Sequence, residues 1–140
     1  MSPDSPNVLI VEDELTAVFA MREFFTSAGY RVDCAAGMLD VMTLLERSRY
    51  DVIITDLHLS QTQRGEGMTV VVCARLRNPH ARIIMLTGFA SETSEREARK
   101  RGADLYQTKP IALLDLAALV EAGQNGVPPA RRAEQGADLR

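Results

Sequence analysis

Short apolar runs alternate with longer amphipathic runs along the whole chain. Five runs predict strands, at residues 8–11, 30–35, 52–55, 83–86 and 103–107. Between and after them, apolar residues recur every three or four positions, which is typical of helices with one buried face. The residues that carry this spacing are Leu15, Val18, Phe19 and Phe25, then Met38, Val41, Met42 and Leu45, then Met68, Val71, Val72 and Leu76, and finally Leu113, Leu114, Ala117, Ala118 and Val120.

The helix expected at residues 91–101 differs from the others, because it has almost no apolar residue beyond Ala98. Strict alternation of strands and helices predicts a parallel sheet that is covered by helices on both faces. The first, third and fourth strands are apolar throughout, as expected for strands inside such a sheet. The second and fifth strands carry polar residues, as expected at its edges. With right-handed crossovers, this predicts an α/β fold of the flavodoxin-like (βα)5 type, with a doubly wound five-stranded parallel sheet in the order 2-1-3-4-5.

Composition agrees with one globular domain. The chain has 140 residues, of which 46% are hydrophobic and 25% charged. We expect a disordered segment at 1–6, a folded domain at 7–122 and a flexible tail at 123–140. The net charge of -3 argues against a general binder of nucleic acid or of anionic membranes.

The lack of a targeting signal and the positions of the cysteines favour a cytoplasmic protein. The sequence has no apolar run long enough to span a bilayer and no secretory signal at its start. Cys34 and Cys73 lie far apart within apolar stretches, which indicates reduced, buried thiols rather than a disulfide or a metal site.

Polar residues follow four of the predicted strands. Glu12-Asp13-Glu14 follows the first strand, Asp56 the third, Thr87 the fourth and Lys109 the fifth. Because the carboxyl ends of parallel strands meet at one edge, these side chains are expected to converge there. Crowded carboxylates repel one another unless a cation lies between them, and oxygen ligands without His or Cys suit Mg²⁺. Taken singly, each residue has an ordinary role as a helix cap, a turn residue or a surface lysine, but those separate roles do not account for the joint pattern.

The ordered set of motifs resembles the receiver (CheY-like) domain of two-component response regulators. The resemblance covers roughly residues 6–122. It is carried by Val11-Glu12-Asp13-Glu14, Thr55-Asp56-Leu57-His58-Leu59, Leu86-Thr87-Gly88-Phe89-Ala90 and Lys109-Pro110-Ile111. Each motif is weak alone, but the set at the ends of four strands is specific.

The resemblance implies a metal-dependent phosphoacceptor. Asp56 is the implied phosphoacceptor, which attacks a phosphohistidine to form an acyl phosphate. Asp13, Asp56 and the backbone carbonyl of His58 are the implied Mg²⁺ ligands, and Glu12 acts mainly through metal-bound water. Phosphoryl transfer needs a carboxylate in line and neutralisation of the equatorial oxygens, which a metal and a lysine supply. No other cofactor is expected.

The resemblance also implies how the phosphoryl group is held and sensed. Lys109 pairs with the phosphoryl oxygens, and its peptide bond to Pro110 is expected to be cis. Thr87 donates a hydrogen bond to one of those oxygens. Tyr106 matches an aromatic switch that turns inward when Thr87 moves.

The loop after the third strand departs from the family pattern in two ways. Ser60 stands where the family usually has a proline, and the loop at 60–67 is longer, with Gly65 and Gly67 as competing anchors for the third helix.

At the rim of the site, the His58 side chain is expected to affect water access rather than to bind metal. We also expect Phe89 to control the access of water to the acyl phosphate.

The expected biological role is that of a stand-alone, single-domain response regulator. The stretch after Glu121 is too short and too polar for a DNA-binding domain. The expected phosphodonor is a sensor histidine kinase or a histidine phosphotransfer protein. Output is expected through the fourth helix, fifth strand and fifth helix to an unknown protein, with no DNA or membrane partner. The protein is expected to be a monomer or weak dimer. We expect no enzymatic activity beyond its own phosphotransfer and dephosphorylation.

Three alternatives differ in chemistry. A Mg²⁺-dependent phosphatase with an aspartyl nucleophile needs a second Asp two residues after the first, where this chain has His58. A nucleotide or flavin binder lacks its glycine-rich loop after the first strand. A phosphate-independent, receiver-like scaffold does not need the complete set of acids, threonine and lysine. The basic run formed by Arg96, Arg99, Lys100 and Arg101 suits either a solvated helix face or contact with an acidic partner.

Overall fold

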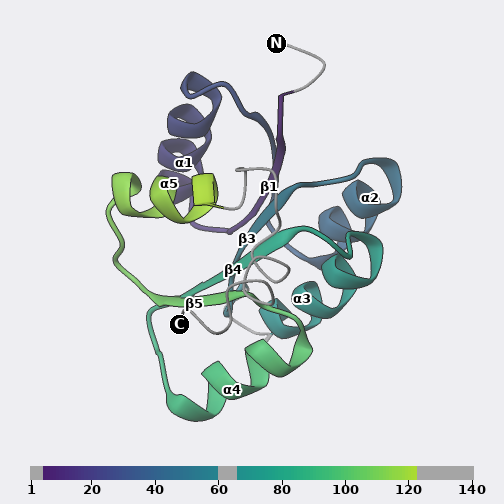
Figure 1. The fold of residues 1–140 in the computed structure, drawn as a ribbon, viewed down its shortest axis with the longest axis vertical. Helices are drawn as coiled ribbons and strands as arrows, with labels where there is room; N and C mark the ends of the chain where they lie inside the picture. Colours follow the sequence, from purple (N-terminus) through teal and green to yellow (C-terminus); the bar gives the residue numbers. More distant parts are fainter. Residues whose placement is uncertain (1–4, 60–65, 123–140) are drawn as a thin grey trace.

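Five parallel strands form one sheet in the order β2-β1-β3-β4-β5 (Figure 1). The computed structural model describes residues 5–59 and 66–122. The strands are β1 (Asn7–Val11), β2 (Arg31–Ala35), β3 (Val52–Asp56), β4 (Arg82–Thr87) and β5 (Leu105–Thr108). The helices are α1 (Leu15–Ser27), α2 (Met38–Arg47), α3 (Glu66–Arg77), α4 (Glu92–Arg101) and α5 (Leu113–Ala122). The predicted fold class and strand order are confirmed.

The helices lie in two layers, with α1 and α5 on one face of the sheet and α2, α3 and α4 on the other (Figure 1). Each face has its own hydrophobic core. In β1, Val8 and Ile10 pack with the α1–α5 side, whereas Leu9 and Val11 pack with the opposite side. This alternation follows from the two-residue period of a strand. Because both of its faces are covered, β1 is continuously apolar.

Edge and interior strands differ in burial, as the sequence predicts. The residues of β4 are all buried, and those of β1 and β3 nearly all, while β2 and β5 are only partly buried. None of the described helices has the length and apolar character that a bilayer crossing requires.

The predicted apolar face of α1 is wrong in part. Met21 and Phe25 are buried, whereas Leu15 is 83% and Phe19 59% exposed. Leu15 and Phe19 are four residues apart and lie on one side of the helix, but two positions out of register with Met21 and Phe25. At the ordinary rotation of 100° per residue, two positions turn their side chains away from the sheet.

Three other large residues from the predicted apolar faces of helices also lie outside the core. Met42 in α2, Leu76 in α3 and Leu114 in α5 are exposed, because neighbouring positions in each helix already fill the space against the sheet. These buried neighbours are Val41 and Leu45, Val70, Val71 and Ala74, and Leu116 and Val120. Cys34 and Cys73 are free thiols but are only half-buried. The buried positions are their neighbours in the chain, Ala35 and Ala74.

Polar contacts, more than apolar packing, hold α4. Ala98 is its one fully buried residue, as its sequence predicts. Ser91 caps the helix by accepting a hydrogen bond from the Ser94 N–H at 3.1 Å. The helix ends at Gly102, whose φ of 127° favours a residue without a side chain.

Arg75 of α3 fastens the end of α4 to the rest of the fold. Its Nη2 donates to the Gly102 carbonyl and to Asp104 Oδ2, each at 2.7 Å. Its Nη1 donates to the carbonyls of Ala81 at 2.7 Å and of Pro79 at 3.0 Å. One guanidinium therefore joins the turn before β4 to the turn before β5.

Replacement of Arg75 is expected to destabilise the domain. In Arg75→Ala, the Asp104 carboxylate and several carbonyls lose their donor, and the loss is expected to be about 3 kcal/mol of unfolding free energy. Urea denaturation measures it. Arg101→Ala is the control, because its ion pair with Glu97 is exposed and is expected to contribute little. Equal loss in both variants would show that Arg75 has no special role.

Candidate functional site

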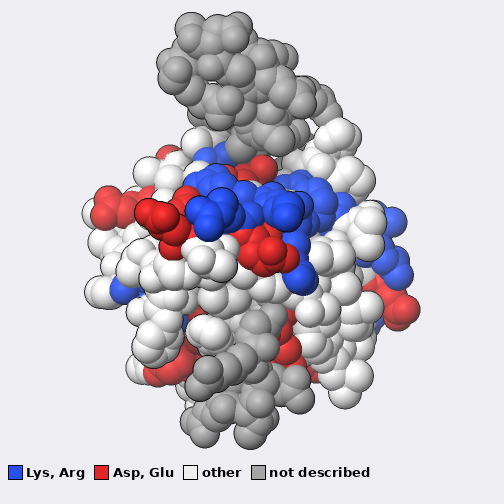
Figure 2. Space-filling view, turned by 90° about the horizontal axis from the view of Figure 1, so that it is seen from below, with Lys and Arg blue, Asp and Glu red and all other residues white. Residues whose placement is uncertain are grey.

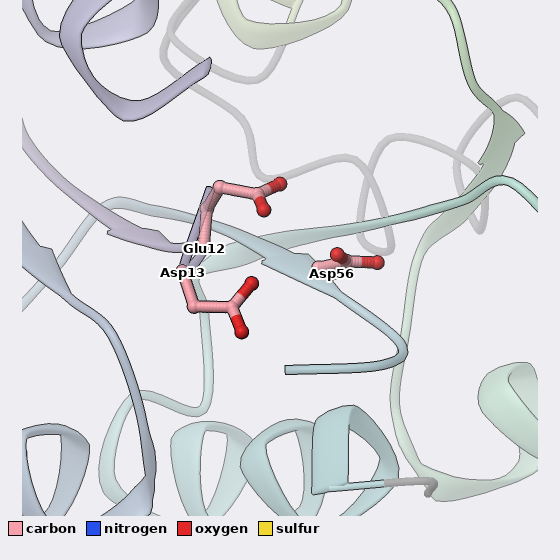
Figure 3. Close-up of side chains that lie close together, drawn as sticks. All are labelled: Glu12, Asp13 and Asp56. Atoms are coloured by element: carbon pink, nitrogen blue, oxygen red, sulfur yellow. The ribbon is translucent and has the colours of Figure 1, made fainter. Parts of the chain in front are cut away.

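Three carboxylates meet at the carboxyl edge of the sheet. Glu12 and Asp13 directly follow β1, and Asp56 ends β3. These strands are neighbours, with Val11 paired to Thr55, so their ends lie side by side. One carboxylate oxygen from each of the three acids lies within 4.8 Å of the others. Figure 3 shows the three side chains at this edge.

Lys109 lies between two of these acids. Its Nζ donates to Glu12 Oε1 at 2.7 Å and to Asp56 Oδ2 at 3.1 Å. Its backbone N–H donates to the Thr87 carbonyl at 2.8 Å, which places the lysine beside the end of β4. The Lys109–Pro110 peptide bond is cis, as expected from the resemblance.

The environment keeps the Lys109 ammonium charged. Burial by itself lowers the pKa of Lys109. The hydrogen bond and charge of Glu12, together with those of Asp56, raise it by more than this, so the pKa of Lys109 lies above its usual value. The Glu12 side chain is only 3% exposed and that of Asp56 11%. One ammonium therefore compensates part of the charge of three acids.

The three acids after β1 have different roles. Glu14 caps α1, with its carboxylate accepting from the Ala17 N–H at 3.0 Å and from the Thr16 hydroxyl. The hydrogen bond from Thr16, and then that from Ala17, lowers the pKa of Glu14. Glu12 Oε2 accepts from the Glu14 N–H at 3.1 Å, which fixes the Glu12 side chain. The capping role thus belongs to Glu14, while Glu12 and Asp13 form part of the acid cluster.

Gly67 allows α3 to press against the backbone that carries Asp56. Its N–H donates to the Leu57 carbonyl at 2.9 Å. A Cβ at this position would lie 2.2 Å from the Asp56 carbonyl oxygen and 2.6 Å from the Leu57 Cα, so no side chain fits. Gly67 is therefore an anchor of α3, whereas Ser60 and Gly65 lie outside the described residues.

His58 lies at the rim of the site. Its N–H points to Asp56 Oδ1 at 3.4 Å. Its ring meets the ring of Phe89 edge-on, with centroids 5.9 Å apart, and Phe89 is 79% exposed. Within the described part of the chain, the cluster of possible metal-binding side chains contains the three acids and not the imidazole.

Thr87 ends β4, and Tyr106 lies in the neighbouring strand β5. Thr87 is fully buried, and its hydroxyl accepts from the Phe89 N–H at 3.0 Å. Tyr106 is 8% exposed. Its hydroxyl bonds to the Ser94 hydroxyl and accepts from the Ser91 N–H at 3.3 Å.

The two serines at the start of α4 were not among the predicted site residues. They connect the ring of Tyr106 to the amino end of that helix. Their spacing, three residues apart at the beginning of a helix, is a capping signal that the sequence does contain. The capping pattern does not indicate which aromatic side chain they meet.

Comparison with known proteins identifies the family. The family model described as the response regulator receiver domain matches residues 8–121. Regulatory protein VanR of Enterococcus faecium is 32% identical over 119 residues, which cover 84% of this chain and 49% of VanR.

Two solved structures at 25% identity share the fold. A response regulator from Burkholderia pseudomallei, with a phosphorylated aspartic acid, calcium ion and citrate, has a TM-score of 0.77 and covers 97% of this chain and 76% of its own. The receiver domain of a sensor histidine kinase from Pseudomonas aeruginosa, with magnesium coordinated in the active site cleft, has a TM-score of 0.72 and covers 84% and 96%.

The chain spans about half the length of the first curated relatives it matches, at 48% and 49% of their lengths. The match to the family model nevertheless runs from β1 into α5, so it includes every strand and the whole acid cluster. With the fold, the strand order and the family model in agreement, this chain belongs to the receiver domain family of response regulators.

Proposed function

We propose that Asp56 accepts a phosphoryl group from the phosphohistidine of a sensor histidine kinase or a histidine phosphotransfer protein. A carboxylate oxygen forms the new bond to phosphorus while the phosphorus–nitrogen bond breaks, and the leaving imidazole takes up a proton. The observation that carries this proposal is the acid cluster of Glu12, Asp13 and Asp56 with the Lys109 ammonium between two of its members. Such a site neutralises charge on the transferred group.

The residues present fit a Mg²⁺ ion. All the clustered donors are carboxylate oxygens, which hard divalent cations prefer, and the ammonium of Lys109 already occupies a cation position between two of them. Glu12, Asp13 and Asp56 would hold the metal, together with the His58 carbonyl that the family resemblance implies. When bound, Mg²⁺ supplies charge neutralisation at the phosphoryl oxygens. The magnesium and calcium ions in the two related structures support this assignment.

Lys109 and Thr87 have separate roles in this proposal. Lys109 reaches both Glu12 and Asp56, so it can turn to a phosphoryl oxygen without leaving the site. The Thr87 hydroxyl oxygen accepts from the Phe89 N–H, so a rotation of the Thr87 side chain toward the phosphoryl group would break that bond. A new hydrogen bond from Thr87 to the phosphoryl group would therefore alter the backbone between β4 and α4.

The switch proposed for Tyr106 follows from the same connection. Its hydroxyl is joined to Ser91 and Ser94, at the start of α4. A change between β4 and α4 reaches both the ring and the helix. Output through α4, β5 and α5 to a protein partner is therefore the expected consequence of phosphorylation.

The surface beside the site suits a protein phosphodonor. Leu15 and Phe19 on α1 and Leu114 on α5 are exposed apolar residues. A hollow of about 320 Å³ lies between these helices, and both Glu12 and Lys109 line it. Apolar surface next to a charged site is typical of contact with another protein.

The remaining expectations concern the whole protein. Stand-alone action, cytoplasmic location and the absence of enzymatic activity beyond its own phosphoryl chemistry stay predictions. The phosphatase and scaffold alternatives differ from the proposal in one measurable respect, which is whether a single aspartate is stably labelled.

Phosphorylation is expected at one residue. With Mg²⁺ and phosphoramidate, a small donor that needs no kinase, the wild-type chain is expected to gain one phosphoryl group, seen by intact-protein mass spectrometry. Asp56→Asn is expected to gain none, because it lacks the nucleophilic carboxylate. Asp40→Asn, which changes an exposed acid in the first turn of α2, is the matched control and is expected to label normally. Continuous release of phosphate without a labelled aspartate would favour the phosphatase alternative.

Removal of one clustered acid is expected to stabilise the metal-free protein. Asp56→Asn relieves repulsion while Glu12 still pairs with Lys109, so its melting temperature without Mg²⁺ is expected to rise by about 3 °C. Saturation with Mg²⁺ is expected to stabilise the wild type by about 2.7 kcal/mol at a hundred times the dissociation constant, and the variant by less. Melting curves with and without Mg²⁺ test this. Identical curves in all four conditions would contradict a shared metal site.

The ring pair at the rim is expected to limit hydrolysis of the acyl phosphate. Phe89→Ala removes the ring that contacts His58 and opens the site to water. The rate of phosphate loss, followed after removal of the donor, is expected to rise at least about threefold, as for loss of an aromatic contact worth roughly 0.7 kcal/mol. Leu39→Ala, which shortens an exposed apolar side chain of α2, serves as the control. An unchanged rate in Phe89→Ala would exclude this role.

A further inference from the structure

We propose that a second, cationic site at the opposite edge of the sheet binds a compact oxyanion of the phosphate type. A hollow of about 210 Å³ lies there, between the connection that enters β3 and the connection that enters β4. These strands are neighbours, with Val52 paired to Arg82, so the two connections lie side by side. The hollow is lined by Arg49, Tyr50, Asp51, Arg77, Asn78, Pro79, His80 and Ala81. None of these belongs to the acid cluster, so the proposal does not depend on the role of Asp56.

Two arginines, Arg49 and Arg77, are among the residues that line this hollow. Arg49 and Arg77 are exposed, and neither forms an ion pair within the described residues. His80 adds an imidazole to the lining. Asp51 is the one acid in the lining, and its Oδ2 accepts from the Asn7 N–H at 2.8 Å, which directs it toward β1. Two guanidinium groups beside one hollow match the planar, bidentate recognition of phosphate oxygens.

The ends of the nearby helices do not account for these arginines. Basic residues often lie at the carboxyl end of a helix to bind its free carbonyl oxygens. Just beyond the end of α3, the carbonyls of Pro79 and Ala81 are bound by Arg75 and not by Arg77. At the end of α2, the Ser48 N–H closes the last turn on the Leu44 carbonyl. Arg49 and Arg77 are exposed and form no ion pair within the described residues, so their side chains are available to a ligand.

The floor of the hollow is fixed before any ligand arrives. Asn78 is buried, with its Oδ1 accepting from the Tyr50 N–H at 2.8 Å and its Nδ2 donating to the Ala74 carbonyl at 3.3 Å. The Arg82 N–H donates to the Asp51 carbonyl at 2.9 Å. A rigid floor reduces the entropy that binding must otherwise supply.

The lining also limits the class of ligand. Tyr50, its one aromatic ring apart from the imidazole, is 4% exposed and offers no face on which a nucleobase can stack. Recognition therefore rests on the oxyanion itself, whether it is free or carried on a larger molecule. A separate group of basic residues on α4 consists of Arg96, Arg99, Lys100 and Arg101, on the side of the molecule seen in Figure 2. Two of them are already paired, Arg99 with Glu95 and Arg101 with Glu97.

Titration with inorganic pyrophosphate tests the site in the chain of 140 residues. The titration is followed by two-dimensional amide NMR, without Mg²⁺ and at constant ionic strength. We expect saturable shifts at the amides of Asn78 and Ala81, with a dissociation constant on the order of 1 mM. The double variant Arg49→Gln/Arg77→Gln is expected to bind at least about tenfold more weakly, because it loses two charged donors. Asp56→Asn is expected to bind as the wild type does.

Matched variants separate binding in this hollow from general attraction of anions to basic surface. Arg96→Gln removes one positive charge on α4 and is expected to change the affinity less than about twofold. A nucleoside diphosphate is expected to bind as pyrophosphate does, which would assign recognition to the oxyanion. Shifts that never saturate, equal weakening by Arg96→Gln, or unchanged binding in the double variant with an intact melting transition would each overturn the proposal. Tighter binding in Asp56→Asn, which removes a carboxylate that repels anions, would place the anion at the other edge and would also overturn the proposal.

Discussion

The crowding of three carboxylates at one edge of the sheet is the constraint around which this domain is built. Glu12 and Asp13 approach Asp56 because β1 and β3 are neighbours, although Asp56 lies 43 positions after Asp13 in the chain. Like charges at this distance repel strongly in a partly buried setting. Lys109, which follows β5, lies between Glu12 and Asp56 and offsets part of the repulsion. The ends of β1, β3 and β5 are thus coupled electrostatically. A change in charge at Asp56 therefore alters the electrostatic energy of Glu12 after β1 and of Lys109 after β5.

Most of the fold was predictable because it depends on burial that leaves a direct trace in the sequence. A strand with both faces covered, such as β1, must be apolar at every position, and an edge strand such as β2 need not be. This contrast identified the edge strands and, together with right-handed crossovers, was sufficient to order the sheet. Helix faces were harder to predict, because Leu15 and Phe19 have helical spacing but lie away from the core. Periodicity shows that a face is apolar and cannot show whether it contacts the sheet or another molecule.

The site was predictable in its acids and its lysine, since parallel topology brings strand ends together. Its supporting contacts were not. Gly65 and Gly67 were equivalent in sequence, and only the approach of α3 to the Asp56 carbonyl distinguishes Gly67. Arg75 was missed altogether, because its partners are mainly backbone carbonyls, which leave no side-chain pattern to recognise. The contact of Tyr106 with Ser94 likewise depends on tertiary structure.

The two ends of α4 are attached by bonds of very different strength. At its carboxyl end, the guanidinium of Arg75 binds the Gly102 carbonyl, and Arg99 donates to the Asp104 carbonyl at 2.8 Å. At its amino end, neutral hydroxyl contacts with Tyr106 are the main polar link to β5. A helix held in this way can pivot about Gly102 once its contacts with Tyr106 break. If α4 responds to the phosphorylation proposed for Asp56, its displacement is therefore greatest at the end that carries Ser91 and smallest at Gly102, where Arg75 holds it.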